Sequence, residues 1–207
     1  MGAYDPSRYA LDLTAYPHIK TETLPGPESV ALHARATRHI RGLSGQVRLF
    51  PVAFESGQGC SLTDVDGNRY IDFSSGIYVT TLGHCHPKVA EAVARHARQL
   101  MNAHDFTTPI KMKLLERLAS ITPGEGPQKL AGMQLYDSGT TAVEAGLRVM
   151  RAATGKFEFI SFHRDFHGKT MGAVGLARLD VSQGLRAPGY FLVPRGYCYR
   201  CEFKQKY

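Results

Sequence analysis

Small and polar residues fill positions 137–144 (Asp-Ser-Gly-Thr-Thr-Ala-Val-Glu), between an apolar segment and an amphipathic one. With a strand before it and a helix after it, such a run leaves backbone N–H groups without partners at the positive end of the helix dipole. A phosphate can accept from these groups and from a Ser or Thr hydroxyl, and Gly139 lets the backbone approach closely. The spacing also fits a plain capping box between Thr141 and Glu144, which needs no ligand.

A second polar loop, at positions 161–170, follows the next apolar segment and contains Phe166. Ligands of open parallel sheets bind outside the carboxyl ends of the strands, so the two loops should meet at one edge. An aromatic ring there can lie flat on a ligand ring whose phosphate occupies the neighbouring loop. The alternative for Phe166 is a core side chain beside a strand end.

Hydrophobic spacing predicts the elements that position these loops. In the second half of the chain, the order of strand, helix and strand indicates a parallel sheet with a right-handed crossover. In the first half, short strands around an Asp66-Gly67 turn indicate an antiparallel meander. A short helix is expected after an extended N-terminal segment that ends at about Pro27, and further helices are expected to begin at Pro87 and Pro109, because proline is tolerated in the first turn. The predicted strands are residues 47–50, 60–63, 69–73, 130–136, 157–162 and 191–193, and the central helix is residues 142–153.

Composition excludes several classes of protein. The 207 residues carry a formal charge of +7, but the basic residues are interleaved with acids, so no nucleic-acid partner is expected. No apolar run approaches the roughly 20 residues of a membrane helix and no secretion signal is evident, so we expect a cytoplasmic protein without membrane contact. Cys198 and Cys201 are interpreted as loop thiols, and His84-Cys85-His86 lacks a third ligand, so no metal site is predicted.

Several spaced motifs together resemble a known family, the class III aminotransferases. The resemblance rests on Ser138-Gly139-Thr140-x-Ala142-x-Glu144-Ala145, on Phe166-His167-Gly168, on Asp64-x-Asp66-Gly67-x-x-Tyr70-x-Asp72-Phe73-x-Ser75-Gly76-Ile77, and on Leu82-Gly83-His84-x-His86-Pro87. Tyr16-Pro17-His18-Ile19-Lys20 and Tyr197-Cys198-Tyr199-Arg200-Cys201 are similar to a branch that includes 4-aminobutyrate and acetylornithine aminotransferases. Two positions depart from the family pattern: Thr141 replaces an acidic residue, and Lys169 replaces an arginine that grips a substrate carboxylate in 4-aminobutyrate enzymes.

The resemblance implies an α/β protein with part of the type I pyridoxal-phosphate fold: a small α+β segment and the first strands and helices of a large three-layer α/β/α domain. We place these parts at residues 1–104 and 105–207. The implied cofactor is pyridoxal 5'-phosphate, and the implied partners are an amino-acid or amine donor, a 2-oxo acid and a second copy of the chain in a homodimer. The implied cofactor-binding residues are Ser138, Gly139, Thr140, Phe166, His167 and Gly168, and the implied substrate residues are Gly76, Ile77, Tyr78 and Lys169.

The lysine that holds the cofactor covalently in this family has no counterpart among the lysines that follow Phe166, namely Lys169, Lys204 and Lys206. We therefore interpret the chain as a fragment that transaminates only as part of a longer protein, and we expect it to fold poorly alone. Two rivals remain open: an amino-acid racemase or epimerase on the same fold, and a non-catalytic truncated product.

Overall fold

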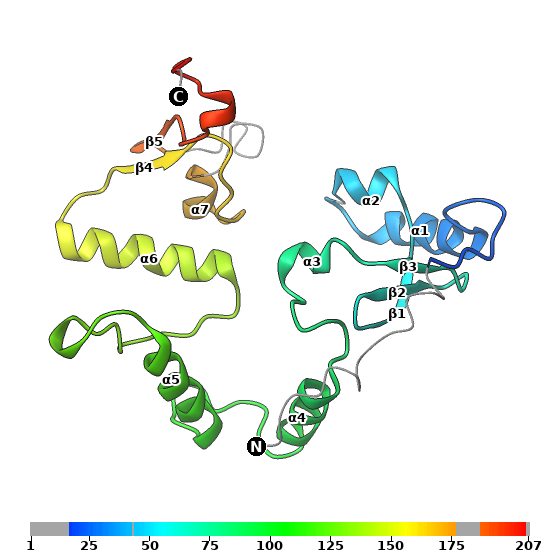
Figure 1. Cartoon of the computed structure of the whole chain (residues 1–207), viewed down its shortest axis with the longest axis horizontal. Coiled ribbons are helices and arrows are strands. Elements are labelled where there is room, and N and C mark those ends of the chain that lie inside the picture. Colours follow the sequence, from blue (N-terminus) through cyan, green and yellow to red (C-terminus); the bar gives the residue numbers. More distant parts are fainter. Residues whose placement is uncertain (1–16, 43, 177–186, 206–207) are drawn as a thin grey trace. The chain divides into compact units, whose positions relative to one another are not determined.

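The computed structural model describes residues 17–42, 44–176 and 187–205 (Figure 1). Contacts divide the chain into two compact units, Met1–Phe106 and Thr107–Tyr207. The domain boundary predicted from the sequence, after residue 104, lies close to this division. The predicted Lys206 position and the Tyr16 end of the first family motif lie outside the described residues.

The first unit contains a three-stranded antiparallel meander with the strand order β1-β2-β3. Its Asp66-Gly67 turn between β2 and β3 is confirmed, and Gly67 takes the positive φ of +80° that a tight turn needs. The elements of this unit are α1 (Pro27–His39), α2 (Gly45–Leu49), β1 (Phe54–Gln58), β2 (Ser61–Asp64), β3 (Arg69–Ile71), α3 (Ser75–Tyr78) and α4 (Pro87–Ala97).

The predicted strand at residues 47–50 is wrong, because this segment belongs to the short helix α2. Ser44 directly precedes the helix, and its carbonyl accepts the Arg48 N–H at 3.1 Å. Leu49 is 87% exposed rather than packed in a sheet. The true first strand, β1, was missed because Phe-Glu-Ser-Gly-Gln has low strand propensity. At Gly57 a larger residue would not fit without a shift, because a Cβ would lie only 2.9 Å from the Leu62 side chain.

A buried carboxylate organises the turn of the meander. Asp64 is fully buried and accepts the Asn68 N–H at 2.7 Å, the Asn68 side-chain amide at 2.9 Å and the Tyr70 hydroxyl at 2.7 Å. Burial, and then the hydrogen bond to Asp64, raises the pKa of Tyr70. Asp66 accepts the N–H groups of Glu28 and Ser29, and so caps the start of α1. The acidic motif of this region therefore serves the local fold.

The second unit contains two parallel strands, β4 and β5, paired from Phe159 opposite Tyr190 to Phe162 opposite Val193. A parallel pair is therefore present, but it joins the predicted strands at 157–162 and 191–193 and does not include the predicted strand at 130–136. The small core joins Leu147, Leu176 and Tyr190, and the rings of Phe159 and Tyr190 stack with centroids 5.5 Å apart. The elements are α5 (Pro109–Ile121), η3 (Gly126–Gln128), α6 (Gly139–Thr154), β4 (Phe159–Phe162), α7 (Met171–Gly175), β5 (Tyr190–Val193) and η4 (Cys198–Arg200).

The predicted strand at residues 130–136 does not form. Its residues have no ladder partner in the described part of the chain, where the parallel sheet consists of β4 and β5, and Leu130 is exposed. Without a neighbour, the backbone groups of an apolar segment gain nothing from an extended conformation. Ile160 and Phe191, on β4 and β5, are also exposed. No helix in the described residues is long and apolar enough to cross a membrane.

Candidate functional site

The polar run at residues 137–144 forms the N-terminus of α6, as predicted, but its capping box differs from the prediction. Ser138 is the N-cap, and its hydroxyl accepts the Thr141 N–H at 3.3 Å while its own N–H donates to the Thr141 hydroxyl at 3.2 Å. Thr141 thus fills the position of the Glu or Gln in an ordinary capping box. The predicted Thr141–Glu144 box is wrong, because Glu144 bonds elsewhere.

Two backbone donors at the start of α6 have no acceptor within the part of the chain that the structure describes. Among the described residues, the N–H groups of Gly139 and Thr140 donate to no protein atom, whereas the next two are bonded to Ser138. The positive end of the helix dipole adds to this unsatisfied donor capacity. The arrangement suits an anion with several acceptor oxygens.

The second predicted loop meets the first through Gly168. This residue is buried, and its φ of +131° is accessible mainly to glycine. A Cβ on Gly168 would overlap the Thr140 side chain and lie 3.1 Å from the Ala173 methyl group. The missing side chain therefore lets the two loops touch, which the sequence predicted only as a shared edge.

The two loops line one open hollow of about 510 Å³. Most of the predicted cofactor residues and Lys169 lie on its surface, and Phe166 presents its ring at 57% exposure. The remaining predicted cofactor residue, Ser138, is the N-cap of α6 and does not line the hollow. The lining residues are Gly139, Thr140, Val143, Phe166, His167, Gly168 and Lys169.

His167 is held by the strand beneath the loop. Its Nε2 lies 3.1 Å from the Ser161 hydroxyl, which itself donates to the Leu176 carbonyl at 3.1 Å. Because that hydroxyl has one hydrogen, His167 is the donor and carries its proton on Nε2. Asp165 lies 3.8 Å from the same nitrogen. These contacts fix the position of the His167 ring relative to β4.

Two residues that connect the loops were not assigned to the site from the sequence, namely Glu144 and Thr170. The Thr170 hydroxyl lies 2.6 Å from Glu144 and 3.1 Å from the Thr140 hydroxyl. The hydrogen bond from Thr170 is the main reason that the pKa of Glu144 is lowered, assisted by the N–H groups of Ala173 and Gly172. A signal for Thr170 was present in the sequence, because a threonine just before a run of small residues is a typical N-cap, here that of α7.

The predicted substrate residues Gly76, Ile77 and Tyr78 lie in the first unit, in a left-handed turn. Ser75, Gly76, Ile77 and Tyr78 have φ values of 50°, 59°, 64° and 64°. Each non-glycine residue in this conformation costs roughly 1–2 kcal/mol, and Ile77 is also β-branched. Ile77 is 75% and Tyr78 81% exposed. Such strain is typical of ligand sites, although a turn can also hold it for structural reasons.

Asp72 anchors this turn. One of its carboxylate oxygens accepts the N–H groups of Ser74 and Ser75 at 2.8 Å and 2.9 Å, and the other lies 2.7 Å from His84 Nε2. His84 in turn pairs through its backbone with Gly59. Within His84-Cys85-His86, the His84 ring is thus bonded to Asp72. Within the described residues, no group of three His, Cys, Asp or Glu side chains could hold a metal ion.

Acid should loosen this anchor. The hydrogen bond with His84, followed by those from Ser75 and Ser74, lowers the pKa of Asp72 from its usual 3.8. A lowered carboxyl pKa contributes stability above the unfolded-state value, and that stability is lost as the pH falls through the folded-state value. We expect the amide-exchange protection of Gly59 and His84 to drop about tenfold across this acidic range. In Asp72→Asn, the amide-exchange protection of Gly59 and His84 should be lower at neutral pH and should not drop further in acid. An acid-dependent drop as large as in the wild type would contradict the role of Asp72 as the anchor.

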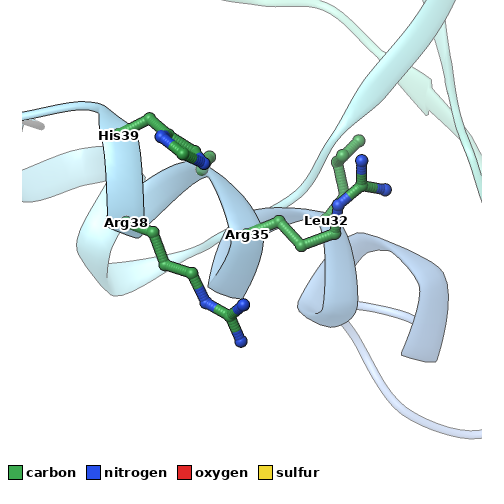
Figure 2. Close-up of a pocket in the computed structure, with 5 residues that line it drawn as sticks. Leu32, Arg35, Arg38 and His39 are labelled. Carbon is green, nitrogen blue, oxygen red and sulfur yellow. The ribbon is translucent and has the colours of Figure 1, made fainter.

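A second hollow, of about 290 Å³, lies along α1 and is lined by Leu32, Arg35, Ala36, Arg38 and His39. Figure 2 shows Arg35 and Arg38 extending from different sides of the same helix rather than converging on one point. All of the lining residues belong to one helix, so the charges are those of a solvated helix face. We assign no chemistry to it. Cys198 and Cys201, in and beside η4, form no disulfide bond within the described residues.

Known proteins resemble both the sequence and the fold. The family model for class III aminotransferases matches residues 43–189. The chain is 36% identical over 162 residues to diaminobutyrate–2-oxoglutarate aminotransferase of Rhizobium meliloti, covering 75% of this chain and 34% of that protein. It is 35% identical over 184 residues to 4-aminobutyrate aminotransferase of Mycobacterium bovis, covering 86% of this chain and 40% of that protein. An (S)-enantioselective omega-transaminase from Thermomicrobium roseum shares 25% identity with a TM-score of 0.72, over 83% of this chain and 41% of that one.

The architecture is therefore part of the type I fold of pyridoxal-phosphate-dependent transaminases, as the sequence predicted. This chain belongs to the class III aminotransferase family. It spans 34% to 40% of the length of the two relatives named above.

The hollow fits the cofactor of this family, pyridoxal 5'-phosphate. The free N–H groups of Gly139 and Thr140 suit the phosphate, and the exposed Phe166 ring suits the face of a pyridine. Lys169 adds a positive charge at the same surface. The donor set and the apolar platform are thus both present within the second unit.

Proposed function

We propose that this chain supplies the phosphate and ring contacts of a pyridoxal-phosphate enzyme that transfers an amino group from an ω-amino acid or related amine to a 2-oxo acid. The observation that carries the proposal is the meeting of Thr140 with Gly168, which places the unsatisfied N–H groups of α6 beside the exposed Phe166 ring. We further propose a cytoplasmic, homodimeric protein that acts by a ping-pong scheme.

The residues of this chain would bind and orient rather than transfer protons at the reacting carbon. Gly139 and Thr140 would donate to the phosphate, Phe166 would pack on one face of the ring, and His167 would keep that loop in place through Ser161. When bound, the cofactor supplies an electron sink for the reacting amine. Lys169 would attract a substrate carboxylate as a point charge without the paired donors of arginine, so a substrate other than 4-aminobutyrate is favoured.

Replacing the ring of Phe166 should weaken cofactor binding selectively. Phe166→Leu keeps an apolar side chain but loses the flat surface, so we expect the dissociation constant for pyridoxal 5'-phosphate to rise about fivefold. The constant can be measured by absorbance titration at the cofactor band. Phe157→Leu changes a phenylalanine outside the hollow that is even more exposed, at 67% against 57% for Phe166, and this variant should bind like the wild type. Equal effects of the two substitutions would contradict the proposed platform.

The covalent lysine is proposed to lie in a segment beyond these 207 residues. In support, Lys169 abuts the cofactor loop and Lys204 follows the last turn, and neither matches the family's catalytic position. We expect no turnover from this chain alone. A protein extended by the downstream codons should lose amine only when a 2-oxo acid is present. Inversion of an amino acid without a 2-oxo acid would instead identify a racemase, and neither reaction would favour a non-catalytic product.

A further inference from the structure

Glu144 makes its contacts outside its own helix. Its carboxylate accepts the Thr170 hydroxyl at 2.6 Å, the Gly172 N–H at 2.9 Å and the Ala173 N–H at 3.1 Å. These three donors form the beginning of α7. A Cβ on Gly172 would overlap the carboxylate, so the glycine permits this close approach. The charge of Glu144 therefore fastens α6 to the segment that follows the ring-binding loop.

Thr170 extends this connection to the phosphate loop. Because its hydroxyl is only 2.6 Å from an ionised carboxylate, Thr170 donates its single hydrogen to Glu144. Its oxygen then accepts from Thr140, 3.1 Å away. Thr140 carries one of the two free backbone donors, and Thr170 directly follows the loop with Phe166 and Gly168. One continuous set of hydrogen bonds thus joins both halves of the hollow.

We propose that Glu144 is a positioning residue that sets the spacing between the phosphate loop and the ring-binding loop. This inference rests on the proposed function, since only a ligand with both a phosphate and a ring must reach both loops at once. A phosphate alone contacts the start of α6, whose N–H groups do not depend on Glu144. Loss of Glu144 should therefore weaken the binding of a ligand with both a phosphate and a ring more than the binding of a simple anion.

The first experiment compares two ligands on the same variant. In Glu144→Ala, we expect the dissociation constant for pyridoxal 5'-phosphate to rise at least tenfold, because three charge-assisted bonds are lost, while that for inorganic phosphate changes less than about threefold. Glu144→Gln keeps an acceptor oxygen without the charge, so its dissociation constant for pyridoxal 5'-phosphate should lie between those of the wild type and Glu144→Ala. If Glu144→Ala weakened the binding of both ligands to the same degree, or left both affinities unchanged, the inference would be overturned.

Thr170 provides a matched pair that leaves Glu144 intact. Thr170→Val removes the hydroxyl and keeps the shape, so it should weaken pyridoxal 5'-phosphate binding about fivefold, whereas Thr170→Ser should restore it. Equal affinities of the Val and Ser variants would contradict the proposed connection.

A measurement without ligand separates this inference from the proposed function. In amide NMR spectra of the free protein, Glu144→Ala should shift the resonances of Thr140 and Gly168 as well as those of Gly172 and Ala173. If only the two α7 amides shift, Glu144 is a local helix cap and the inference fails. If all four shift but the wild-type protein binds no pyridoxal 5'-phosphate, the proposed function fails while the coupling between the loops stands.

Discussion

A single added methyl group at position 168 is expected to abolish most cofactor binding. In Gly168→Ala, the new Cβ would overlap Thr140, and alanine would have to adopt a φ of +131°. The backbone strain and the displaced Thr140 side chain together cost roughly 2–4 kcal/mol. We therefore expect the dissociation constant for pyridoxal 5'-phosphate to rise about a hundredfold, measured by absorbance titration.

The matched control for this substitution is Gly146→Ala, inside α6. A Cβ there meets no atom within 4 Å, and alanine favours a helix, so cofactor affinity should not change. If Gly168→Ala also bound within threefold of the wild type, the close contact between the two loops would not be part of the binding site.

The largest effect on stability is expected at Asp64. In Asp64→Ala, the Asn68 N–H, the Asn68 amide and the Tyr70 hydroxyl lose their shared acceptor in a fully buried position. Buried donors without partners cost about 1–3 kcal/mol each, so the free energy of opening of the meander should fall by about 3–5 kcal/mol. Amide exchange of β2 in the full chain measures this quantity.

Glu55→Ala is the control for Asp64→Ala, because Glu55 is an exposed carboxylate on the neighbouring strand β1. Its removal should change the opening free energy by less than about 0.5 kcal/mol. Similar losses from both substitutions would show that general charge, rather than the buried network, stabilises the meander.

Local signals explain which elements were predictable from the sequence. Pro87 and Pro109 begin helices where expected, since proline fits the first turn whatever surrounds it. The strands at residues 47–50 and 130–136 were wrong for a different reason. Their apolar pattern was real, but a strand also requires a partner, which the pattern of one segment cannot specify. Gly57 conversely lies in a strand because it pairs with Leu62 of β2, and that pairing is not visible in the local sequence.

For the candidate site, the sequence predicted which loops meet but not all of the contacts between them. The two loops meet as predicted, but not for the predicted reason, because the loop that carries Gly139 follows no strand in the described residues and the contact is made by Gly168 against Thr140. The partner of Glu144 did not follow from local spacing, because the capping-box pattern competes with contacts 26 residues away at Thr170. The binding roles of these residues remain predictions.

The most direct test of the account is an NMR-monitored titration with pyridoxal 5'-phosphate of the protein extended by the downstream codons. The account predicts saturable shifts of the Gly139 and Thr140 amides, together with the ring protons of Phe166. Shifts that instead centre on Arg35 and Arg38 of α1, or no saturable shift at all, would contradict it.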